Sequence, residues 1–137
     1  MPRCIPLREQ DLLDYFRRML PARGRVVVGA GDDAAVVRLP EGRRAVLKTD
    51  ATVEGVHFAR GTPPQAAGWK AVARAASDLA AMGAHPAAVV AALSLPPGTP
   101  FDFVRRFYAG MRKACRSFGA VLCGGDLVAS RGPFAVA

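Results

Sequence analysis

Helical windows and apolar runs alternate in the second half of the sequence. One helix is expected over residues 65–82 and another over residues 101–118, and a glycine follows each of them. Apolar runs typical of buried strands follow at 86–95 and 120–123. Four residues share one face of the second helix: Phe103, Phe107, Met111 and Ala114. Helices and strands that alternate along a chain in this way predict an α/β fold.

The first third of the sequence is rich in β-branched residues. An amphipathic helix is expected over residues 8–20, stopped by Pro21, and its apolar stripe should pack on another element. Three short strands are expected after it, joined by turns. Their bounds are 25–29, 34–39 and 44–50, with a turn at 40–43 and an irregular stretch at 51–64.

The sequence ends inside an apolar run at 133–137 that is typical of one more strand. Because a strand normally pairs with a neighbour, we expect either the amino-terminal part of a longer protein or a sheet completed by another subunit. A length of 137 residues predicts a single domain, residues 1–137.

The composition is that of a globular protein, with 51% hydrophobic and 22% charged residues. No apolar run approaches the roughly 20 residues that cross a bilayer, so a membrane span is excluded. The first residues lack the apolar stretch of a secretory signal, which favours a cytoplasmic location. Cys4, Cys115 and Cys123 have neither disulfide-framework nor zinc-site spacing and are expected to be buried thiols.

The net charge is +8, which favours binding of polyanions such as nucleotides, phosphorylated metabolites or nucleic acid. The arginines are scattered in pairs, as solvated helix faces and turns usually carry them. No aromatic residues alternate with them to stack on bases, and no helix-turn-helix or zinc-finger spacing appears. Nucleic-acid binding is therefore a minor hypothesis.

The acidic residues are more informative than the basic ones. Several aspartates sit beside small or apolar residues, away from charged surface helices; they are Asp32, Asp33, Asp50, Asp78 and Asp126. Asp78 falls in a helical window that is apolar nearly all round, so we expect that helix to be buried on both sides. A buried carboxylate needs a partner such as a metal ion. The alternative is a solvated Asp78 paired with Arg74, four residues earlier.

Two glycine-rich segments precede three of these aspartates, Asp32, Asp33 and Asp126. The segment 29–34 formally fits the dinucleotide pattern G-x-G-x-x-A, but a strand, not a helix, is expected after it, so we reject that reading. An ordinary turn is the alternative there, and a tight turn is the alternative for Gly124-Gly125-Asp126, expected after a strand. Thr49-Asp50 is expected to close the third strand. Together the carboxylates suggest oxygen ligands for Mg²⁺ that bridges nucleotide phosphates.

Four motifs in order resemble the amino-terminal half of the thiamine-monophosphate kinase family. The motifs are Gly31-Asp32-Asp33-Ala34-Ala35-Val36; Lys48-Thr49-Asp50 with Val53-Glu54-Gly55-Val56-His57-Phe58; Ser77-Asp78-Leu79-Ala80-Ala81-Met82-Gly83-Ala84; and Gly124-Gly125-Asp126. The resemblance covers essentially the whole sequence. It implies a mixed β-sheet with flanking helices, as in the amino-terminal domain of the aminoimidazole ribonucleotide synthetase-like superfamily, with sheets joined across a homodimer.

The resemblance also implies an activity and its residues. The activity is ATP-dependent phosphorylation of thiamine monophosphate to thiamine diphosphate, by in-line transfer assisted by several Mg²⁺ ions, with no acid, base or nucleophile assigned. The implied metal ligands are Asp33, Thr49, Asp50, Asp78 and Asp126; His57 would contact the substrate; Tyr108, Gly125 and Asp126 would contact ATP. Without the resemblance, His57 would be read as a surface histidine and Tyr108 as a core residue.

The sequence departs from the family pattern in two places. Lys48 stands where the family usually has a small hydroxyl residue, and Leu127 stands where the family commonly has Thr or Asn. The carboxy-terminal domain of the family is absent from this sequence. The alternatives are a non-catalytic nucleotide- or metal-binding dimeric domain, or another member of the same ATP-binding superfamily.

Overall fold

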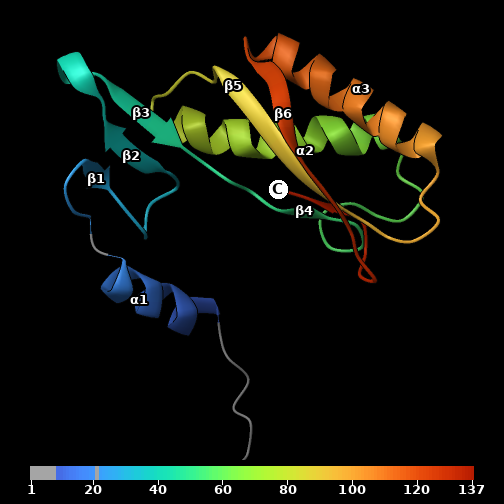
Figure 1. The fold of residues 1–137 in the computed structure, drawn as a ribbon, viewed down its shortest axis with the longest axis horizontal. Helices are drawn as coiled ribbons and strands as arrows, with labels where there is room; N and C mark the ends of the chain where they lie inside the picture. The colour runs from blue at the N-terminus through green and yellow to red at the C-terminus, as the bar shows by residue number, and fades with distance from the viewer. Residues whose placement is uncertain (1–8, 21) are drawn as a thin grey trace, which may run out of the picture. The chain divides into compact units, whose positions relative to one another are not determined.

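The structure is a computed structural model that describes residues 9–20 and 22–137 (Figure 1). The chain divides into two compact units, one up to Lys48 and one from Thr49 to Ala137. We describe each unit by itself. No helix in the described ranges is long and apolar enough to cross a membrane.

The first unit holds one helix and a small antiparallel sheet. Helix α1 spans Glu9–Met19, and the sheet has the order β1-β2-β3. The strands are β1 (Val26–Val28), β2 (Ala35–Arg38) and β3 (Arg44–Leu47), and the 3₁₀ turn η1 (Pro40–Gly42) joins the last two. These elements confirm the expected helix and three strands, and β2 after the 29–34 segment confirms that no dinucleotide-binding helix begins there.

Two expectations for this unit are wrong. Strand β3 ends at Leu47, so Thr49-Asp50 does not close it; its partner β2 is four residues long, and the ladder ends where Ala35 pairs with Leu47. The apolar stripe of α1 also stays exposed, with Leu12 39% and Met19 59% exposed.

The second unit holds a mixed sheet with two helices. The sheet order is β4-β7-β5-β6, in which β5 and β6 are parallel and β7 runs antiparallel to β4 and β5. The elements are β4 (Thr52–Val53), α2 (Pro64–Ala81), β5 (Ala88–Leu95), α3 (Phe101–Ser117), β6 (Val121–Ala129) and β7 (Ala135–Val136). The predicted mixed α/β architecture is confirmed. The terminal strand β7 is paired on both sides within the chain.

Helices α2 and α3 cover one face of this sheet, and the core lies between them and the strands (Figure 1). From α3, the predicted face is buried: Phe107 and Ala114 are 0% exposed and Met111 is 2% exposed. From the sheet, Ala91 and Leu93 of β5 are each 1% exposed. Alternate residues of β5 are exposed, so the other face of the strand is left uncovered.

The cysteines do not all behave as predicted. Cys115 is buried in α3, but Cys123 on β6 is exposed, so the prediction of buried thiols is wrong for Cys123. Its strand has an irregularity at this point, where the register shifts between Val89 and Val90 of β5. An extra residue in one strand of a pair is displaced from the regular ladder. Cys4 lies outside the described residues.

Candidate functional site

A tight turn follows β4 and forms one wall of a pocket. Its bonds run from the Val56 and His57 amides to the Val53 carbonyl, at 3.2 and 2.8 Å, and from the Gly55 amide to the Phe58 carbonyl, at 2.8 Å. Gly55 has φ +80°, a left-handed conformation that glycine adopts without a steric penalty. The glycine of the V-x-G-x-H-F motif is therefore needed to close this turn.

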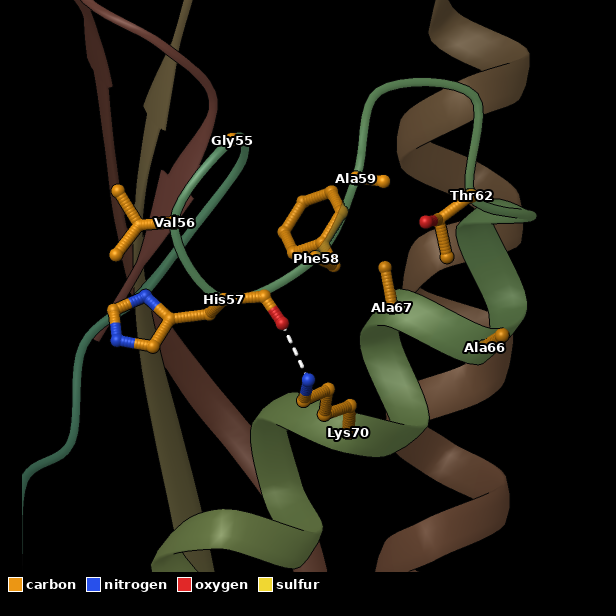
Figure 2. Close-up of a pocket in the computed structure, with 9 residues that line it drawn as sticks. All are labelled: Gly55, Val56, His57, Phe58, Ala59, Thr62, Ala66, Ala67 and Lys70. Carbon is orange, nitrogen blue, oxygen red and sulfur yellow. Dashed lines mark hydrogen bonds between the residues drawn. The ribbon is translucent and has the colours of Figure 1, made fainter.

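The pocket has a volume of about 560 Å³ and lies between this turn and the first turns of α2 (Figure 2). Its floor is apolar, because Phe58 and Ala67 are buried, 8% and 1% exposed. Two nitrogen-bearing side chains line it, those of His57 and Lys70. No carboxylate is among the described residues that line it, so the pocket favours an anion over a cation.

The His57 ring is held in one orientation by the backbone. Its Nδ1 accepts a hydrogen bond from the Val53 amide at 3.0 Å. A ring nitrogen that accepts a hydrogen bond carries no proton, so the proton of the neutral ring sits on Nε2. His57 can therefore offer Nε2–H as a hydrogen-bond donor to a ligand.

Lys70 was not singled out by the sequence reasoning. Its ammonium donates a hydrogen bond to the His57 backbone carbonyl (Figure 2). A sequence signal did exist, because Lys70 and Arg74 are spaced one helical turn apart in the otherwise apolar start of α2.

Asp50 is tied to the same helix. Arg74 Nη2 lies 3.1 Å from Asp50 Oδ1, and Arg74 Nη1 donates to the Ala51 carbonyl at 3.3 Å. The Asp50 side chain is 16% exposed. The guanidinium and the carboxylate form an ion pair that fixes the position of the Asp50 side chain.

Asp78 lies near the end of α2 and is half-buried. Burial on α2 is confined to its first half, at Ala67, Gly68, Ala71 and Val72. The expectation of a helix buried on both sides is therefore wrong for the part that carries Asp78. Helix α3 and the sheet cover one stripe of α2, and the fully buried residues of that stripe end at Val72, before Asp78.

Gly124-Gly125-Asp126 lies inside β6, so the expectation that it follows a strand is wrong, and so is the alternative of a tight turn. The parallel ladder with β5 continues through all three residues, with Gly125 opposite Ala91 and Asp126 opposite Ala92. A Cβ on Gly125 would lie 1.9 Å from the Ala91 carbonyl oxygen, and Gly125 has φ +154°. Close strand pairing therefore requires this glycine. Asp126 is exposed on the face of the sheet that α2 and α3 leave uncovered.

The remaining predicted site residues occupy three settings. Asp33 is exposed in the first unit, where its amide donates to Asp32 Oδ1 at 2.9 Å. Thr49 is exposed just before β4. Tyr108 on α3 is half-buried against the core. The described residues contain no group of three or more His, Cys, Asp and Glu side chains placed to hold a metal ion.

The predicted metal ligands nevertheless have the donor chemistry that Mg²⁺ prefers. They supply carboxylate and hydroxyl oxygens, which are hard ligands, and no thiol or imidazole is among them. In the structure Asp50 is neutralised by Arg74, so a cation at Asp50 would share or replace that guanidinium.

Comparisons with known proteins agree on one family. Residues 31–137 match the family described as AIR synthase related protein, N-terminal domain. The thiamine-monophosphate kinase of Synechococcus elongatus is 42% identical over 130 residues, which cover 94% of this chain and 38% of that protein. The kinase of the same name from Aquifex aeolicus is 36% identical over 121 residues, covering 88% of this chain and 38% of that protein.

A solved structure is similar over the same region. AaThiL complexed with AMPPCP and TMP superposes with a TM-score of 0.81 at 33% identity, covering 93% of this chain and 40% of that one. The chain thus spans about two fifths of the length of the curated relatives it matches. It belongs to the family of AIR synthase related proteins, as an N-terminal domain of the type found in thiamine-monophosphate kinases.

Proposed function

We propose that this chain is the amino-terminal part of an ATP-dependent kinase that phosphorylates thiamine monophosphate to thiamine diphosphate. The observation that carries the proposal is its similarity to AaThiL complexed with AMPPCP and TMP, over 93% of this chain. Thiamine-monophosphate kinases at 33–42% identity support the same activity. The chain's positive charge of +8 suits two anionic substrates.

The pocket beside His57 is the proposed contact with thiamine monophosphate. The Nε2–H group of His57 would donate to a phosphate oxygen. The buried Phe58 and Ala67 give the pocket an apolar floor. The absence of carboxylates from the described lining favours an anionic group at this position. The residue therefore binds and orients the substrate, and it needs no role in proton transfer.

The proposed ligands of several Mg²⁺ ions are Asp33, Thr49, Asp50, Asp78 and Asp126. Bound Mg²⁺ would neutralise charge that develops on the transferred phosphoryl group. The chain's own part is to hold carboxylate oxygens in position, as Arg74 does for Asp50. Direct in-line transfer requires no protein nucleophile, and none is proposed.

The proposed contacts with ATP are Tyr108, Gly125 and Asp126. The structure supplies a second reason for glycine at 125, the close approach to Ala91, so this residue does not by itself indicate a nucleotide. Lys48 would not ligate a metal as an ammonium, which leaves Thr49 and Asp50 as ligands in that segment. Leu127, the next residue along β6 after Asp126, is 64% exposed.

A homodimer with joined sheets is part of the proposal. The uncovered face of the sheet carries Val90 and Val121, which are 68% and 64% exposed. Exposed apolar side chains that cluster on a sheet face are typical of a surface that pairs with another protein chain. Sedimentation velocity tests this, with a dimer expected for the chain and a monomer for Val90→Glu. The cytoplasmic location expected from the sequence stays a prediction.

Titration of a non-hydrolysable ATP analogue into the chain, with and without Mg²⁺, tests the nucleotide and metal site. Binding is expected to need Mg²⁺ and to weaken at least about tenfold in Asp78→Asn/Asp126→Asn, since each removed charge weakens the hold on the cation. Asp102→Asn is the matched control, because Asp102 is an exposed carboxylate on α3 outside the site. Binding that ignores both Mg²⁺ and the double substitution would contradict the proposal.

A non-catalytic nucleotide- or metal-binding dimeric domain is the second candidate. It is favoured by Lys48 and Leu127, which depart from the family pattern in the segments of the predicted metal and nucleotide contacts. The distinguishing measurement is thiamine diphosphate formation from ATP and thiamine monophosphate. Product formed by the chain, alone or with the remaining part of a relative added, supports the kinase; Mg²⁺-dependent ATP binding without product in either case supports the second candidate.

A further inference from the structure

Two cations one turn apart on α2 reach back to the segment before the helix. Lys70 donates to the backbone carbonyl of His57, 13 residues earlier, and Arg74 donates to the carbonyl of Ala51, 23 residues earlier. Both contacts go to backbone oxygens. Arg74 therefore fastens the chain just before β4, and Lys70 fastens it between β4 and α2.

His57 is held at two ends. Its carbonyl accepts from Lys70, and its ring Nδ1 accepts from the Val53 amide at 3.0 Å. Figure 2 shows the Lys70 side chain ending at that carbonyl, while the imidazole extends away from it. Lys70 therefore contacts the backbone of His57 and leaves the ring itself accessible.

The bonds inside the turn do not fix its position relative to the helix. They join Gly55 to Phe58 and His57 to Val53, all within the turn and the end of β4. Among the described residues that line the pocket, the Lys70 side chain links α2 to the turn through its hydrogen bond to the His57 carbonyl. If the carbonyl moved, the ring would rotate with the backbone, and the geometry of the Val53 bond would be lost.

We propose that Lys70 is a positioning residue that keeps His57 in the Nε2–H tautomer and aims that donor at an anionic ligand. Lys70 uses one of its three N–H donors on the carbonyl, and the helix α2 supplies a rigid base for it. The part of this inference that concerns thiamine monophosphate rests on the function proposed above. The part that concerns the orientation of His57 stands on the geometry alone.

The first test is the tautomer of His57, measured by long-range ¹H–¹⁵N correlation NMR on the chain at pH 8. The wild type is expected to show an unprotonated Nδ1 and a protonated Nε2. In Lys70→Gln we expect a mixture of tautomers and a rise of about tenfold in the exchange rate of the Val53 amide. Lys70→Arg should restore the wild-type spectrum, since a guanidinium also donates to a carbonyl.

Two controls separate positioning from loss of charge or fold. Arg112→Gln removes one positive charge from an exposed residue of α3 and should leave His57 and Val53 unchanged. The core amide of Leu93 should keep its slow exchange in Lys70→Gln, which shows that the fold persists. A Lys70→Gln protein that retains both the wild-type tautomer and the wild-type Val53 exchange rate overturns the inference.

Titration with thiamine monophosphate separates the two proposals. A dissociation constant raised about tenfold in Lys70→Gln, together with the tautomer change, supports both. Weaker binding with an unchanged tautomer overturns the positioning role, because Lys70 would then act through its charge. A tautomer change in a protein whose wild type does not bind thiamine monophosphate supports the positioning role and contradicts the substrate assigned to this pocket.

Discussion

Cys115 and Cys123 sit in opposite environments. Cys115 is 2% exposed in the core, and Cys123 is exposed on β6, where its Sγ donates to the Val89 carbonyl at 3.3 Å. Burial raises the pKa of the Cys115 thiol, so its thiolate is disfavoured. In a Cys4→Ser background at pH 8, an aromatic disulfide reagent should modify Cys123 at least about 100-fold faster than Cys115. Equal rates in the folded protein would contradict this burial.

The same pKa shift predicts a pH dependence of stability. The pKa of Cys115 is higher in the folded protein than in the unfolded one. The contribution of this thiol to the free energy of unfolding is therefore fully present below the usual thiol pKa range, and it is lost as the pH rises through the folded pKa. Thermal unfolding between pH 7 and 10 should therefore lose more stability in the wild type than in Cys115→Ala. The other titrating groups are the same in the two proteins, so their effect on stability cancels in this comparison.

At the scale of single residues, the sequence identified groups whose neighbours are unusual and missed groups whose partners are distant. Asp50 and Asp78 stand out because small or apolar residues lie beside them in the sequence. The one-turn spacing of Lys70 and Arg74 marks them as a pair of cations but does not indicate what they bind. Their carbonyl partners lie 13 and 23 residues away, and a carbonyl has no sequence signature. The role of a cation that binds backbone appears only once the chain is folded.

Helices α2 and α3 cross at a pair of glycines. A Cβ on Gly68 would lie 2.1 Å from the Phe107 carbonyl oxygen, and one on Gly110 would lie 2.0 Å from the Gln65 carbonyl oxygen. Glycine to alanine normally stabilises a helix interior by roughly 1 kcal/mol. Here the backbones would have to separate, so Gly68→Ala and Gly110→Ala should each destabilise the protein by about 2–3 kcal/mol. Urea unfolding measures the effect.

The control for this prediction is Ser77→Ala on the exposed side of α2. It should change the free energy of unfolding by less than about 0.5 kcal/mol, and in the stabilising direction. A stabilising effect of Gly68→Ala or Gly110→Ala would show that the helices do not approach this closely.

Element boundaries diverged from expectation where a partner strand decided them. The long helices were predicted from periodicity to within a few residues, because each buries its own stripe. Strand β6 continues through Gly124 and Gly125, residues that usually mark turns, because β5 offers it a continuous ladder up to Ala129. Strand β3 ends earlier than expected because β2 has no residue to pair with it beyond Leu47. Strand length is a property of a pair, which one strand's residues do not encode.

For the molecule as a whole, the motifs predicted the family and its fold class, and family membership is confirmed over residues 31–137. The motifs did not predict the division at Lys48, because Lys48-Thr49-Asp50 was read as the end of a strand. Contacts within each unit, and not local sequence, draw that boundary. The spatial grouping of the predicted metal ligands stays a prediction for the same reason, since the ligands come from both units.

The two units should differ in local stability. In the described part of the first unit, the buried hydrophobic residues are Ala34 and Val36, whereas the second unit contains the hydrophobic core cluster with Phe107 and Leu93. Amide protection follows buried apolar contact, so the slowest-exchanging amides should lie in β5 and α3. Amides of β2 should exchange through opening reactions whose free energy is at least about 2 kcal/mol lower, which corresponds to a roughly 30-fold faster exchange rate.

Hydrogen exchange followed by mass spectrometry on the chain measures this difference. Phe107→Ala supplies the control, since removing a fully buried ring from the second unit should lower protection in β5 and α3 by about 3–5 kcal/mol. If the units open independently, protection in β2 should stay unchanged in that variant. A parallel loss in β2 and β5 would show instead that the chain unfolds as one cooperative body, and equal wild-type protection in β2 and α3 would contradict the ranking of the two units.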